Sequence, residues 1–170
     1  MEYNENNNPI KELQLNCIKI SFDTQKWQSE NAKLNFGDLS QDEFLTECAY
    51  GNIEIFEDLS TNKIITLQNI ELGYLLLELE FVMQEIMTQD NGYIGGKVTS
   101  MHQNFALHLM EGEDEETSEV VITNNYTQER EQQTHLQFAT EMLMQEINIC
   151  KKYYLQTVKE CYPTLVLDID

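Results

Sequence analysis

The chain has 170 residues and carries 30 acidic side chains against 10 basic ones, which gives a formal net charge of −20. A surface this negative repels phosphate groups, so the composition argues against direct binding to nucleic acid or to an anionic membrane. The hydrophobic fraction of 41 % is nevertheless too high for a chain that is disordered throughout, and we expect a folded domain with its own core.

The N-terminal residues 1–8 are polar and are predicted to form a disordered tail before a single domain over residues 9–170. They begin with an acid and a run of Asn, where a secretory signal would have a basic and then an apolar stretch. The most apolar segment, residues 70–87, contains four Glu, so we expect no membrane span. The sequence therefore predicts a cytoplasmic protein.

The first part of the domain is predicted to be rich in strands. Residues 12–22 read as one strand, and residues 23–42 as an irregular connection anchored by Trp27. Between residues 43 and 67 three short alternating runs predict an antiparallel meander, with tight turns at Gly51-Asn52 and at residues 60–63.

A helix is predicted over residues 70–89, with Asn69 as its N-cap. One side of this helix is apolar, and three acids recur every seven residues on the opposite side. The apolar residues are Leu72, Leu75, Leu76, Leu79, Val82, Met83 and Ile86, and the acids are Glu71, Glu78 and Glu85.

The second part is predicted to contain a hairpin and a long helix. Residues 97–110 and 118–126 alternate as two strands, joined by an acidic turn. Thr127 is expected to cap a helix that continues to Tyr162, where Pro163 stops it, and the closing residues add a short strand. The order predicts an α+β fold, an antiparallel sheet of about five to seven strands (a meander plus a hairpin) covered on one face by two amphipathic helices.

No catalytic or metal-binding motif is found. The cysteines are Cys17, Cys48, Cys150 and Cys161, and the histidines are His102, His108 and His135. The cysteines contain no C-x-x-C pair and are expected to be free, mostly buried thiols, and the histidines lack the spacing of metal ligands. The segment GYIGGKV lacks the spacing of a phosphate-binding loop. We therefore expect no cofactor, no metal and no enzymatic activity; a pocket with His102 or His108 beside a carboxylate would favour an enzyme instead.

Negative charge is concentrated in the middle of the chain. Between residues 64 and 150 the only basic residues are Lys97 and Arg130, against fifteen acids. A basic protein partner would gain association rate from such a surface, while solubility alone is the competing explanation. The predicted partner-binding residues are Glu111, Glu113, Asp114, Glu115, Glu116 and Glu119 of the hairpin turn, and Glu71, Glu78 and Glu85 of the first long helix.

In size, charge and α+β composition the chain resembles the small acidic immunity proteins of bacterial toxin systems. That resemblance implies a non-enzymatic inhibitor that neutralises a basic toxin or nuclease by electrostatic complementarity. Two alternatives stay open: a phage-type DNA mimic that blocks a nucleic-acid-binding enzyme, and a structural homodimer held by an apolar strip of the long helix.

Overall fold

The computed structural model describes residues 8–32, 40–57, 64–88, 95–100, 103, 105–112, 116–124 and 134–167. Within these ranges the fold is α+β, as predicted, with two four-stranded antiparallel sheets and four helices. Residues 1–7 of the predicted tail and the last three residues lie outside the described part of the chain.

The first sheet, termed sheet A, is a meander of four strands. They are β1 (Ile10–Gln14), β2 (Ile18–Asp23), β3 (Gly51–Phe56) and β4 (Ile64–Ile70), paired in that order. Along β2 and β3 the side chains of Ile18, Ile20, Ile53 and Ile55 are buried, and the residues that alternate with them are half-buried. This period of two is expected of a sheet with one face on the core.

The second sheet, termed sheet B, has the same meander topology. Its strands are β5 (Gly95–Thr99), β6 (Phe105–Glu111), β7 (Thr117–Asn124) and β8 (Thr134–Ala139), again paired in chain order. Leu109, Val120 and Leu136 lie opposite one another across β6, β7 and β8, and all three are buried. Cross-strand apolar contacts of this kind fix the register of the sheet.

Each sheet is followed in the chain by a long helix. Helix α3 (Leu72–Met87) follows sheet A and α4 (Thr140–Cys161) follows sheet B, while the short helices α1 (Thr24–Glu30) and α2 (Gln41–Glu47) connect β2 to β3. The two halves of the chain thus share one arrangement, four strands and then a helix, although no repeat is visible in the sequence. Among the described residues, no helix is both long and apolar enough to cross a bilayer.

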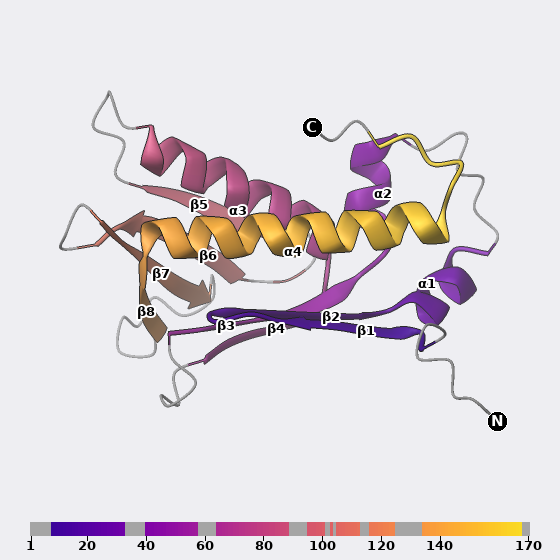
Figure 1. Ribbon diagram of the computed structural model, residues 1–170, viewed down its shortest axis with the longest axis horizontal. Coiled ribbons are helices and arrows are strands. Elements are labelled where there is room, and N and C mark those ends of the chain that lie inside the picture. Colours follow the sequence, from indigo (N-terminus) through magenta and orange to yellow (C-terminus); the bar gives the residue numbers. More distant parts are fainter. Residues whose placement is uncertain are drawn as a thin grey trace.

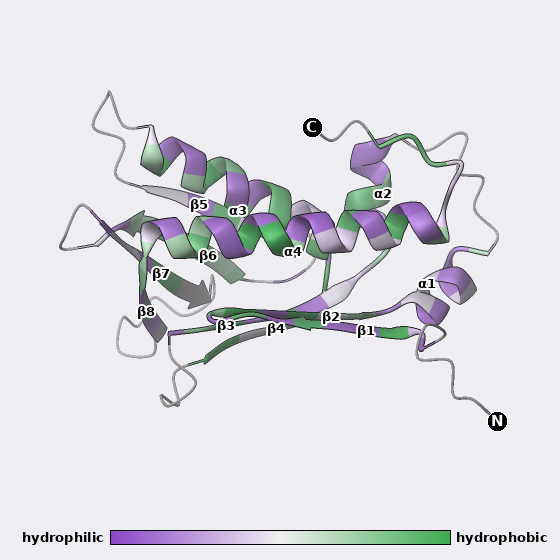
Figure 2. Ribbon diagram, viewed as in Figure 1, coloured by the Kyte–Doolittle hydropathy of each residue, from purple (hydrophilic) through white to green (hydrophobic). Residues whose placement is uncertain are grey.

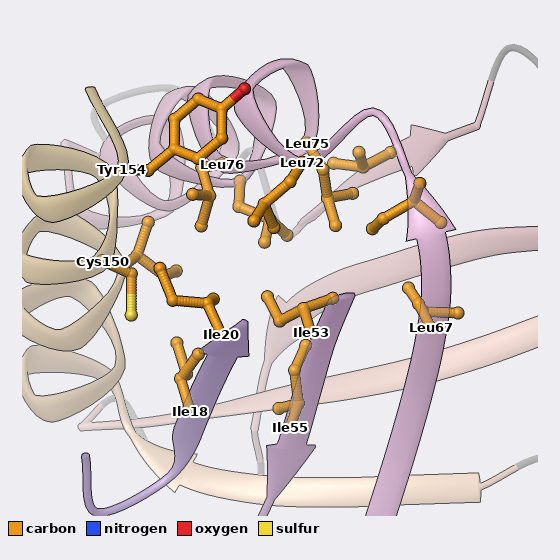
Figure 3. Close-up of a cluster of buried hydrophobic side chains, with 14 of the residues drawn as sticks. Ile18, Ile20, Ile53, Ile55, Leu67, Leu72, Leu75, Leu76, Cys150 and Tyr154 are labelled. Atoms are coloured by element: carbon orange, nitrogen blue, oxygen red, sulfur yellow. The ribbon is translucent and has the colours of Figure 1, made fainter. Parts of the chain in front are cut away.

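The two long helices join both sheets into one buried core. Figure 1 shows α3 and α4 side by side, with sheet A beneath them and sheet B at the end where α4 begins. Helix α3 packs on β3, β5 and β6, and α4 packs on β2, β7 and β8. At a rise of about 1.5 Å per residue, α4 is about 33 Å long and therefore reaches both sheets. Figure 3 shows Ile20 and Ile53 of sheet A in one buried cluster with Leu72, Leu76 and Cys150 of the helices.

Aromatic side chains anchor the segment between α2 and β3. Trp27 stacks on Phe22 with ring centroids 4.7 Å apart, and its Nε1–H donates to the carbonyl oxygen of Tyr50 at 2.7 Å. The Tyr154 hydroxyl of α4 donates to the carbonyl oxygen of Ala49 at 3.0 Å. The prediction that Trp27 anchors its stretch of chain is confirmed, whereas residues 23–42, predicted as an irregular connection, contain helix α1 in their described part.

Two buried charged side chains also join α4 to its neighbours. Glu146 is only 4 % exposed and accepts hydrogen bonds from the backbone N–H of Asn16, from the backbone N–H of Cys17 and from the Cys17 thiol. Lys151 of α4 forms an ion pair with Glu80 of α3. Because both contacts link segments far apart in sequence, they fix where α4 lies on the strands and on α3.

The prediction of a single sheet of about five to seven strands is wrong, since the described residues contain eight strands in two sheets. Two segments predicted as single strands are hairpins. Residues 12–22 divide into β1 and β2 at a turn in which Leu15 N–H donates to the Ile18 carbonyl oxygen at 2.8 Å, and residues 97–110 divide into β5 and β6. The apolar positions change from odd to even numbers between Leu15 and Ile18, and that change marks the turn.

Two further segments have the other type of secondary structure. Residues 43–50 were predicted as a strand, but residues 43–47 belong to α2, and residues 134–139, predicted as part of the long helix, form β8. At the start of α2 the Ser40 hydroxyl accepts from Glu43 N–H at 3.2 Å, and the Glu43 carboxylate accepts from Ser40 N–H at 2.9 Å. This capping box favours a helix. The long helix itself packs on strands and ends before Pro163, as predicted, but residues 164–167, predicted to begin a strand, form none.

The link between β4 and α3 also differs from the prediction. Asn69 does not cap α3, because the helix begins only after Glu71. The φ angle of Asn69 is 51°, a left-handed conformation that Asn tolerates better than most residues. Gly51 and Asn52, predicted as a tight turn, begin β3, and Asn52 Oδ1 accepts from Asn69 N–H at 2.9 Å. The turn predicted at residues 60–63 lies outside the described residues.

Candidate functional site: an acidic cleft

A cleft of about 700 Å³ opens between the C-terminal end of α3, the N-terminal end of α4 and the base of the β6–β7 hairpin, and we term it the acidic cleft. Its described lining consists of Ile86, Met87, Glu111, Glu116, Ala139, Thr140 and Glu141. The volume falls within the range of about 300–1,000 Å³ that is usual for ligand pockets. Three of the lining residues are acids, and each is supplied by a different part of the chain.

Backbone hydrogen bonds hold these parts together. Thr140 N–H, at the start of α4, donates to the carbonyl oxygen of Glu116 at 2.9 Å, and the hydroxyls of Ser118 and Thr140 are hydrogen-bonded at 2.6 Å. At the base of the hairpin Gly112 N–H donates to the carbonyl oxygen of Thr117 at 2.9 Å. A Cβ on Gly112 would lie 2.2 Å from Thr117 Oγ1, so any larger residue there would require the Thr117 side chain to move. The chain therefore brings the end of β6, the start of β7 and the start of α4 to one place.

The charge of the cleft is uncompensated within the described residues. None of the ion pairs formed there includes Glu111, Glu116 or Glu141. Glu141 lies in the first turn of α4, where the partial positive charge of the helix N-terminus favours a carboxylate by about 0.3–1 kcal/mol. The apolar part of the lining is supplied by Ile86 and by Met87, which is 51 % exposed. The cleft thus combines three anionic groups with an accessible apolar wall.

The acids predicted from the hairpin turn are placed differently from one another. Glu111 and Glu116 line the acidic cleft, and Glu119 lies on β7 with its carboxylate hydrogen-bonded to Nδ1 of His135 on β8. The other three, Glu113, Asp114 and Glu115, lie outside the described residues. Glu141, which completes the cleft, was not among the predicted residues, because the long helix was expected to begin at residue 127 and no chain reversal was expected before it.

The three acids predicted on the outer side of α3 do not form one exposed face. Glu71 is 2 % exposed, precedes the first helical residue and accepts a hydrogen bond from the Ser100 hydroxyl at 2.7 Å. Its backbone has non-helical dihedral angles, so the seven-residue spacing to Glu78 does not place it on the helix surface. Glu78 is half-buried and Glu85 is exposed. The prediction that Glu71 lies on the exposed face of the helix with Glu78 and Glu85 is therefore wrong.

Among the described residues, the lining of the acidic cleft includes no cysteine and no histidine. The four cysteines are free, and three of them are buried, as predicted. Burial raises the pKa of the Cys150 thiol from 9.0 to about 12, and it also raises the pKa of the Cys17 thiol, with a further contribution from its hydrogen bond to Glu146. These thiols therefore stay protonated at neutral pH and are poor nucleophiles.

The histidines in the described residues lie on sheet B. His108 on β6 has a pKa lowered by burial and then by Lys97, and His135, predicted in the long helix, is on β8 beside Glu119. His102 lies outside the described residues. Within the part of the chain that the structure covers, no group of three or more His, Cys, Asp or Glu is placed to hold a metal ion.

A comparison with known protein families finds no family model that matches the chain, and a comparison with curated proteins finds no matching relative.

Proposed function

We propose that the chain is a non-enzymatic acidic protein that binds a basic protein partner, in the manner of an immunity-type inhibitor that neutralises a cognate toxin or nuclease. The observation that carries this proposal is the acidic cleft, where Glu111, Glu116 and Glu141 surround an apolar wall. The described lining of the cleft contains no cysteine, and burial raises the pKa of the Cys17 and Cys150 thiols elsewhere in the structure.

The chemistry of the cleft matches a lysine or arginine side chain of the partner. Such a side chain has an aliphatic stem that packs on apolar surface and a cationic head that requires carboxylates. Met87 and Ile86 would contact the stem, and the three carboxylates would bind the head. Hydrogen bonds between charged groups are about twice as strong as neutral ones, and arginine can make two in parallel.

The net charge of −20 supports the same proposal at longer range. Complementary charge raises association rate constants from about 10⁵–10⁶ to as much as about 10⁸–10⁹ M⁻¹s⁻¹ at low salt. Speed of this kind benefits an inhibitor that must reach a toxin before the toxin reaches its target. Because salt screens charges over about 8 Å at physiological ionic strength, the association should slow as salt is added.

The test uses the purified protein as immobilised bait in extracts of its own source cells, at low and high salt, with the retained proteins identified by mass spectrometry. A cleft variant, Glu111→Gln/Glu116→Gln/Glu141→Gln, is compared with a control variant of equal charge change. That control, Glu12→Gln/Glu30→Gln/Glu160→Gln, changes exposed acids remote from the cleft.

The proposal predicts a basic protein that the wild type and the control retain at low salt, that the cleft variant loses, and whose activity the wild type inhibits after purification. Retention of the same proteins by all three baits, or a specific partner that is not basic, would contradict it.

A further inference from the structure

The outer face of α3 carries an exposed aromatic ring that no part of the described structure covers. Phe81 is 58 % exposed, although the opposite side of the same helix is packed into the core through residues such as Leu79 and Val82. Leu77, one turn earlier, is partly buried and packs against the hydrophobic core, and its accessible part lies next to Phe81. Figure 2 shows apolar and hydrophilic residues alternating along α3. Phe81 and the accessible part of Leu77 thus form a short apolar strip on the helix surface.

Two carboxylates lie beside Phe81, on one side of this strip. Glu78 and Glu85 lie three residues before and four residues after Phe81, so both are its neighbours on the helix surface. Neither carboxylate takes part in an ion pair among the described residues, whereas Glu80 of the same helix is paired with Lys151. Helix α3 contains no Lys or Arg at all. Its solvent side therefore carries an apolar strip with two carboxylates along one side.

We infer that this face of α3 is a docking surface for an arginine-bearing amphipathic segment of the basic partner, an inference that rests on the proposed function. Arginine stacks its planar guanidinium on an aromatic ring while its N–H groups bond to carboxylates beside the ring. Phe81 offers the ring, Glu78 and Glu85 offer the carboxylates, and Leu77 offers a contact for an apolar side chain of the same segment.

The position of the strip connects it to the acidic cleft. Phe81 precedes Met87, which lines the cleft, by six residues, or about 9 Å along the helix axis. Met87 lies about 120° around the helix from Phe81, so a segment that contacts both must pass from the outer face of α3 round to its C-terminal end. A second copy of this chain is a poorer occupant, because its own α3 would present the same negative charge and each copy carries −20.

The test measures fluorescence anisotropy of a labelled synthetic peptide of about 14 residues, made of Leu and Arg in an amphipathic helical order. A peptide of the same composition, with the order scrambled so that no apolar face forms, controls for charge alone. The protein variants are Phe81→Ser, the matched control Ile149→Ser on the exposed side of α4, and the cleft variant described above. Circular dichroism confirms that each variant is folded.

The amphipathic peptide should bind the wild type more tightly than the scrambled peptide does. Phe81→Ser should weaken binding of the amphipathic peptide by about tenfold, the effect of losing an anchor residue. The affinity of Ile149→Ser should stay within about twofold of the wild type. Equal binding by Phe81→Ser and the wild type, or no preference for the amphipathic peptide, would overturn the docking surface. If only the cleft variant loses binding, the docking surface is wrong and the proposed function stands; if no variant differs from the wild type, both are wrong. Self-association of the wild type that Phe81→Ser abolishes would assign the strip to a second copy and also overturn the inference.

Discussion

Replacing Glu146 by Ala should destabilise the fold more than any exposed substitution on α4. The Glu146 carboxylate is buried and accepts three hydrogen bonds from the β1–β2 turn, two from backbone N–H groups and one from the Cys17 thiol. The bond from Cys17 N–H is 2.8 Å long, and Cys17 is fully buried. In the alanine variant this N–H has no acceptor and no access to water.

The size of the effect follows from opposing terms. Each hydrogen bond to a charged acceptor contributes about 1.5–3 kcal/mol, and a buried donor left unpaired costs about 1–3 kcal/mol. The variant also removes a carboxylate whose burial is itself unfavourable, and Asn16 is exposed, so its N–H regains water. We therefore expect a net loss of about 2–4 kcal/mol for Glu146→Ala. Glu146→Gln keeps one acceptor oxygen and should lose about half as much.

Urea denaturation at pH 7, followed by the fluorescence of the single Trp27, measures these losses. The midpoint should fall while the dependence on urea concentration stays the same, since the change affects stability and not the surface exposed on unfolding. Glu160→Ala, an exposed acid on the same helix, should stay within about 0.5 kcal/mol of the wild type. A decrease of less than about 1 kcal/mol in the free energy of unfolding of Glu146→Ala would refute the view that this carboxylate holds α4 on the β1–β2 turn.

Three further substitutions or conditions test local features of the fold. Ala49 has a left-handed φ of 57°, so Ala49→Gly should stabilise the protein by up to about 1 kcal/mol in the same urea assay. A Cβ on Gly73 would lie 2.6 Å from the Tyr154 ring, and Gly73→Ala should lose about 1–2 kcal/mol, because the overpacking outweighs the gain of about 1 kcal/mol in helix propensity. Burial holds the pKa of the Cys150 thiol at about 12 in the folded state, above its ordinary value of 9.0. As the pH rises past 9, the unfolded chain loses this proton while the folded protein keeps it, so the free energy of unfolding must fall. Urea midpoints measured at pH 8 and pH 10.5 should therefore differ less in Cys150→Ala than in the wild type.

The sequence was a good guide where one periodicity was unambiguous. The helix predicted over residues 70–89 is α3, with its seven apolar positions buried, because the stripe excludes any other element. At residues 134–139 two patterns coexist. Leu136 and Phe138 alternate as in a strand, while Leu136, Ala139 and Leu143 also match helical spacing. The pairing of β8 with β7 decides between them, and that is a tertiary contact.

The candidate site was predicted only in part for the same reason. Glu111 and Glu116 were among the predicted residues because they flank an obvious turn, but Glu141 joins them only once β8 reverses the chain before α4. Helix α2, predicted as a strand, did have a local helical signal in the sequence, since Ser40 and Glu43 have the spacing of a capping box. The exposure of Phe81 could not be read from the sequence, because a helical pattern does not reveal which surface residues lack a cover.

A basic partner that binds at the acidic cleft and along the outer face of α3 must shield both surfaces from solvent. Hydrogen exchange followed by mass spectrometry, on the protein alone and with its purified partner, measures this shielding. We predict slower exchange on complex formation in peptides covering the C-terminal half of α3, the β6–β7 hairpin and the first turns of α4, and no change in β1 or α1. Protection confined to β1 and α1, with the cleft unchanged, would contradict the account.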